Sequence, residues 1–162
     1  MLYFVILLIV ISLVYNIYAL ILNKGALESI SISSYVFLIN GKKYYYFTIY
    51  CFAVAFILLP IWLTISAVDI QFLTFLSCCG IIFAGSTPLF KEKFQGTVHY
   101  IAGIIAVLCY LLWMIFSKYY IWLIAEVIVT VVLITIDYKN FVYYTEIIGL
   151  FTLLILLLVL LV

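Results

Sequence analysis

The residues of this sequence that could carry chemistry are few, and a single histidine is the first of them. His99 follows the polar stretch 86–97 (STPLFKEKFQGT) and opens a long apolar run. An imidazole can exchange a proton near neutral pH and can donate or accept hydrogen bonds, so it suits acid–base work or ligand recognition. By depth in a helical bundle, we expect Asp137, Glu146, Ser86 and Thr87 to lie level with His99. These five residues form the first candidate site.

This cluster has a binding interpretation, a catalytic one and a structural one. Lys91 and Lys93 precede His99 and could meet anionic headgroups, each contributing about 1 kcal/mol near a membrane surface. Ser86, His99 and Asp137 would make a hydrolytic triad, but no GxSxG motif surrounds the serines. The structural alternative is a histidine that caps its helix or faces headgroups at the membrane boundary. No catalytic residue is assigned.

Glu126 is the second candidate, because it lies in the middle of an apolar run (IWLIAEVIVT). A charged side chain at that depth costs about 3 kcal/mol on insertion scales, so it faces protein or a water-filled cavity. At 100° per residue, Trp122, Glu126 and Thr130 share one stripe, which we expect to face the bundle interior. Glu126 is either a protonated structural carboxyl or a proton- or cation-coupling group.

The sequence predicts no metal and no cofactor. Four cysteines fall inside apolar runs without zinc-binding spacing and are interpreted as small buried hydrophobes: Cys51, Cys78, Cys79 and Cys109. One histidine per chain excludes a bis-histidine haem within the chain. The net charge of +1 argues against a nucleic-acid partner.

The elements that must position these residues are membrane helices. The chain is 71% hydrophobic and 8% charged, against about 25% charged in a soluble domain. A bilayer core takes about 20 apolar residues per helix, and backbone groups in lipid must be satisfied within the element. The fold class is therefore all-α, an integral membrane bundle in one domain, 1–162, with six transmembrane helices: 2–22, 44–66, 71–87, 98–117, 119–136 and 142–162.

Three local features of this bundle are predicted as well. The fourth and fifth spans together are too long for one crossing, so a tight turn is expected at Ser117–Lys118. Ala102 and Ala106 form a small-xxx-small pair, which lets another helix approach closely. Interior hydroxyls such as Thr48 and Ser77 should join helices. Residues 31–40 of the first loop, with Ser31, Ser33 and Ser34, are expected to lie at the interface.

Orientation follows from the lysines, since the sequence has no arginine. Six lysines lie in the odd-numbered loops and Lys118 alone in an even-numbered one; the six are Lys24, Lys42, Lys43, Lys91, Lys93 and Lys139. The positive-inside rule therefore predicts cytoplasmic odd-numbered loops and both termini outside.

The segment Val98-His99-Tyr100-Ile101-Ala102-Gly103, after a polar loop, resembles the helix opening of small six-helix membrane proteins of the DRAM/Frag-like type. The resemblance covers about thirty residues and the helix count, and it implies a six-helix bundle without established enzymatic chemistry.

Three classes of function remain open at this point. The favoured one is a non-enzymatic membrane module that binds lipid, a membrane protein partner or further copies of itself in a homo-oligomer. The alternatives are a small proton- or cation-coupled transporter or channel using Glu126, and a membrane-embedded enzyme centred on His99.

Overall fold

The fold is described by a computed structural model for residues 1–22, 45–87 and 92–162, with the backbone alone for 92–96. Over these ranges the chain contains α-helices, two short 3-10 turns and no strand. The helices are α1 (Leu2–Leu22), α3 (Tyr45–Ile65), α4 (Gln71–Ser86), α5 (Glu92–Phe116), α6 (Tyr120–Ile136) and α7 (Phe141–Leu161), and the turns are η1 (Val68–Ile70) and η3 (Tyr138–Asn140). Lys91 and the predicted interfacial serines lie outside the described residues.

These helices confirm the all-α membrane class. Among the described residues, five stretches are long and apolar enough to cross a membrane, and α6, a sixth apolar helix, is shorter at 17 residues. Seventeen residues rise about 25 Å, at the lower limit for a span. The clearest difference from prediction is α5, which begins six residues before the expected Val98. The helix therefore extends beyond the apolar run into the polar stretch that precedes it.

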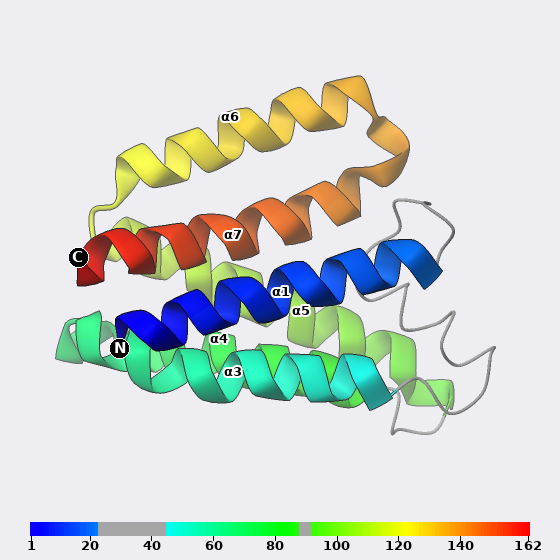
Figure 1. Cartoon of the computed structure of the whole chain (residues 1–162), viewed down its shortest axis with the longest axis horizontal. Helices are drawn as coiled ribbons and strands as arrows, with labels where there is room; N and C mark the ends of the chain where they lie inside the picture. The colour runs from blue at the N-terminus through cyan, green and yellow to red at the C-terminus, as the bar shows by residue number, and fades with distance from the viewer. Residues whose placement is uncertain (23–44, 88–91) are drawn as a thin grey trace. The chain divides into compact units, whose positions relative to one another are not determined.

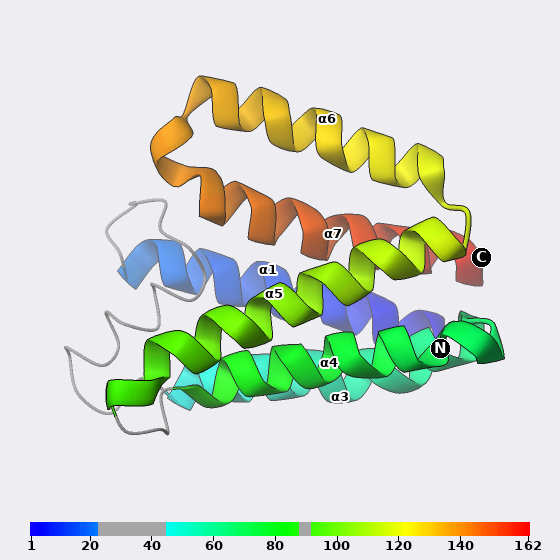
Figure 2. The ribbon, with the colours of Figure 1, turned by 180° about the vertical axis from the view of Figure 1, so that it is seen from behind.

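The helices divide into two compact units. Unit 1 contains α1, α6 and α7, and unit 2 contains α3, α4 and α5. In unit 1, α7 packs against both α1 and α6. It runs antiparallel to each of them, so the beginning of α1 and the end of α7 lie at the same end of this unit (Figures 1 and 2).

In unit 2, α4 packs against α3 on one side and against α5 on another. The Thr48 hydroxyl donates to the Gly85 carbonyl at 2.7 Å, and the Ser77 hydroxyl donates to the Ala106 carbonyl at 2.8 Å. Both bonds join two helices, as predicted. A Cβ on Gly80 would stand 2.7 Å from the Ala102 carbonyl oxygen and 2.9 Å from the Ala106 Cβ. The small-residue pair on α5 is therefore a packing seam, and its partner is Gly80.

The core of unit 2 includes an aromatic cluster. Trp62 and Trp113 are both fully buried, and their rings meet edge to face with centroids 5.2 Å apart. Tyr110 completes the cluster with its ring 6.2 Å from Trp62. Aromatic pairs favour this geometry because the positive ring edge meets the negative face. These rings hold α3 and α5 together where α3 ends.

The tight turn predicted at Ser117–Lys118 is present. Lys118 has a φ of 61°, its N–H bonds to the Ile115 carbonyl at 3.1 Å, and the Tyr119 N–H bonds to the Met114 carbonyl at 2.9 Å. This pair of bonds is the Schellman motif, which ends a helix with one residue in the left-handed region. The motif satisfies two of the last carbonyls of α5 and terminates that helix.

Candidate functional site

His99 contacts the end of α4, which packs beside α5. The Thr87 hydroxyl donates to the Ala84 carbonyl at 2.7 Å. The Nδ1 atom of His99 lies 3.3 Å from the Thr87 oxygen and 3.3 Å from the Ala84 carbonyl oxygen. Because the Thr87 proton is already directed to Ala84, both oxygens face Nδ1 as acceptors. The pattern assigns a proton to Nδ1, which leaves Nε2 as the acceptor of the neutral ring.

Both polar and aromatic groups surround His99. Thr87 is 5% exposed, whereas His99 is half-buried. The ring of Phe47 on α3 lies 6.2 Å from the imidazole, measured between centroids. Helices α3, α4 and α5 thus all contribute to this end of unit 2. A polar pair held by a backbone carbonyl and backed by an aromatic ring can present one imidazole edge at the membrane boundary.

The structure describes three other residues that sequence reasoning grouped with His99. The Ser86 hydroxyl donates to the Ile82 carbonyl of its own helix at 2.8 Å, so Thr87 contacts the histidine instead. Asp137 and Glu146 belong to unit 1. There the Asp137 carboxylate accepts from Asn140 Nδ2 at 2.7 Å and from Tyr144 Oη at 3.1 Å. Asp137 therefore stabilises the turn between α6 and α7.

Two further predicted residues are placed only in part. Glu146 is half-buried on α7. Lys93 belongs to the first turn of α5, where the backbone alone is described. Thr87, which sequence reasoning also placed level with His99, is the member of that group that contacts the imidazole.

Glu126 lies half-buried in the middle of α6. A Cβ on Gly149 of α7 would stand 3.3 Å from its Oε1 atom, so the carboxyl rests against the backbone of α7. Trp122 and Thr130, on the predicted stripe, are half-buried as well. The stripe is therefore a less exposed side of α6, and Gly149 provides the space for the carboxyl.

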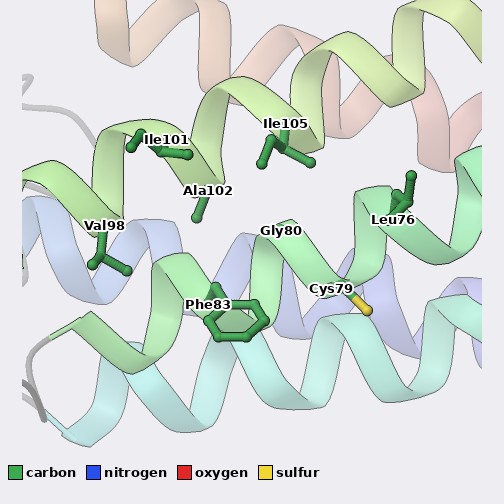
Figure 3. A pocket seen from close by; sticks show the side chains of 8 residues that line it. All are labelled: Leu76, Cys79, Gly80, Phe83, Val98, Ile101, Ala102 and Ile105. Atoms are coloured by element: carbon green, nitrogen blue, oxygen red, sulfur yellow. The ribbon is translucent and has the colours of Figure 1, made fainter.

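An apolar groove that sequence reasoning did not anticipate lies between α4 and α5. Its volume is about 300 Å³, and eight residues line it: Leu76, Cys79, Gly80, Phe83, Val98, Ile101, Ala102 and Ile105. Ala102 points toward Gly80 across the gap between the helices, and Phe83 lies opposite Val98 (Figure 3). Gly80 and Ala102 let the two helices approach closely at the floor of the groove. The larger lining side chains face outward, and Phe83 is 55% and Ile101 54% exposed.

Among the described residues, no group of three or more His, Cys, Asp or Glu side chains is placed to hold a metal ion. The four cysteines are free thiols. Comparison with protein-family models, with curated proteins and with solved structures finds no match to this chain.

Proposed function

We propose that this chain is a non-enzymatic, multi-pass membrane module that binds a lipid headgroup at the end of unit 2 formed by Thr87 and His99. The observation that carries the proposal is the bonding of His99 Nδ1 to Thr87 and Ala84. These bonds orient the ring, and a headgroup hydroxyl or ammonium would donate to Nε2. Polar groups fixed in advance bind with less loss of conformational freedom.

The test is the set of lipids that remain bound to the purified protein, measured by native mass spectrometry in detergent. We expect His99→Ala and Thr87→Val to weaken retention of the preferred headgroup class by about tenfold, or 1.4 kcal/mol. Ser86→Ala is the matched control, since that hydroxyl donates to the Ile82 carbonyl of its own helix. A lipid profile identical in the wild type and in a folded His99→Ala variant would contradict the proposal.

The orientation that accompanies this function places both termini outside and the odd-numbered loops in the cytoplasm. The lysine distribution supports this, with six lysines against one. The antiparallel packing of α1 and α7 within unit 1 is consistent with termini on one side (Figure 1). His99 and Thr87 would then contact lipids of the cytoplasmic leaflet.

Single-cysteine accessibility in sealed vesicles tests this orientation, in a variant with the four native cysteines replaced by alanine. A cysteine at position 1 should react with an impermeant maleimide from outside, whereas one at position 139 should react only after permeabilisation. The reverse pattern would invert the topology and move the headgroup contact to the outer leaflet.

A second candidate function, a proton- or cation-coupled transporter or channel, is favoured by Glu126. Its carboxyl lies half-buried in mid-helix against Gly149, and an ionisable group at that depth of a membrane helix marks a candidate ion or proton pathway. Glu126→Gln keeps the shape and removes the charge. We expect this variant to abolish pH-dependent ion flux in proteoliposomes if the function is transport. Unchanged flux in a folded variant would remove this candidate.

A further inference from the structure

We propose that the groove between α4 and α5 holds one acyl chain of a membrane phospholipid. The inference deepens the proposed function, on which it rests, by assigning a second contact to the same lipid. The groove is lined only by apolar side chains, by one thiol and by Gly80. A hydrocarbon chain is the occupant that such a lining accepts without leaving a polar group unsatisfied.

The dimensions of the groove favour a single chain. Leu76 to Phe83 and Val98 to Ile105 each span eight residues, or about 10 Å along a helix. The groove has a volume of about 300 Å³ over that length, with one wall on each helix. Carbon atoms in van der Waals contact are about 3.5–4 Å apart, so a single row of methylenes along the groove can contact both walls.

A helix from a second copy fits less well. An α-helix with its side chains is about 10–12 Å across, as much as the whole length of the groove, so only a few of its side chains would reach the lining. A stable protein interface buries about 1,200 Å² or more in total, which a slot of this length does not provide. The groove is also uncharged along its lining, so it offers no ion pair to fix a partner helix.

The depth of the groove matches one leaflet. Val98 is the second residue of the span Thr97–Phe116, and Ile105 lies near the middle of that span. On α4, the lining positions from Leu76 to Phe83 continue one turn later at Thr87, the partner of His99. The groove therefore begins at the polar end of unit 2 and runs toward the centre of the bilayer. A phospholipid with its headgroup at that end would place a chain along the groove.

The test is photolabelling in phosphatidylcholine vesicles that contain a phosphatidylethanolamine, whose ammonium can donate to Nε2, with a diazirine in one acyl chain. We expect peptides of α4 and α5 to carry adducts on lining residues about tenfold more often than on Ile104, an outward-facing α5 residue that does not line the groove. A diazirine near the headgroup should label Val98 and Phe83, whereas one further down the chain should label Leu76 and Ile105.

Filling the groove provides the matched variants. Ile105→Trp enlarges an outward-facing lining side chain without touching the Gly80 seam, and Ile104→Trp makes the same change outside the groove. We expect the first variant to reduce labelling of Phe83 and Leu76 by about tenfold, and the second to leave it unchanged.

Equal labelling of the lining residues and of Ile104 would overturn the inference, because it would indicate ordinary lipid contact. Covalent dimers joined through lining residues, with no lipid adducts there, would assign the groove to a second copy and overturn it too. A His99→Ala variant with an altered lipid profile, together with no preferential labelling in the wild type, would leave the headgroup contact standing and refute the acyl-chain site. An unaltered profile with preferential labelling would refute the headgroup contact alone.

Discussion

The indole N–H of Trp113 on α5 donates a 2.8 Å hydrogen bond to the hydroxyl of Ser66, which directly follows α3. Ser66 donates in turn to the Trp62 carbonyl at 2.6 Å. Both side chains are buried, with Ser66 7% exposed and Trp113 fully enclosed. These two hydrogen bonds join the end of α3 to α5 in a buried region, where water does not replace a lost partner.

Trp113→Phe should therefore lower the stability of unit 2 by more than Trp62→Phe. The first change removes a buried hydrogen bond, which costs about 1–3 kcal/mol when a partner is left unsatisfied. The second removes an indole N–H that has no hydrogen-bond partner among the described residues. Thermal unfolding in detergent, followed by circular dichroism, measures the difference. Equal losses for the two variants would show that ring volume, and not the bond to Ser66, decides stability here.

Gly80→Ala should destabilise the packing of α4 on α5. The added Cβ would lie 2.7 Å from the Ala102 carbonyl oxygen, and backbone cannot move aside cheaply. Overpacking of this kind costs about 1–3 kcal/mol. Gly103→Ala is the control on α5, because a Cβ there meets nothing within 4 Å. That variant should be neutral or more stable, since alanine favours helix over glycine by about 0.5–1 kcal/mol. The stability of both variants is measured by unfolding in detergent.

Lys118→Gly should stabilise the turn after α5. Lys118 adopts a φ of 61°, and an L-residue in the left-handed region costs about 1 kcal/mol relative to glycine. Lys118→Ala removes the charge but keeps the Cβ, so it should give no gain. A melting temperature raised equally by both variants would trace the effect to charge, contrary to this prediction.

Thr48→Val should weaken the contact between α3 and α4 by about 0.6 kcal/mol, the mean for a hydrogen bond between membrane helices. The Thr48 hydroxyl bonds to Gly85 across the two helices. The hydroxyl of Thr145 bonds instead to Phe141 within α7, so Thr145→Val serves as the control. Denaturation of both variants in mixed micelles gives the comparison, and a larger loss for Thr145→Val would contradict the assignment.

The sequence by itself determined the helices and their class. Uninterrupted apolar runs leave no other way to satisfy backbone groups in lipid, so α1, α3, α4, α6 and α7 begin and end within one or two residues of the predictions. The turn at Lys118 also followed from length, because the apolar stretch around it is too long for one crossing. The polar beginning of α5 was missed, since the length of an apolar run does not predict that the helix already begins in the polar stretch before it.

Only the tertiary structure decided which faces meet. In a bilayer the lipid tails are as apolar as leucine, so hydrophobic pattern does not distinguish a packed face from a lipid-facing one. Ala102 and Ala106 signalled a seam, but the sequence did not identify Gly80 as the residue that meets them. For the same reason Thr87, and not Ser86, contacts His99. The groove between α4 and α5 is likewise a product of helix placement, which depends on side-chain shape at the contact and not on composition.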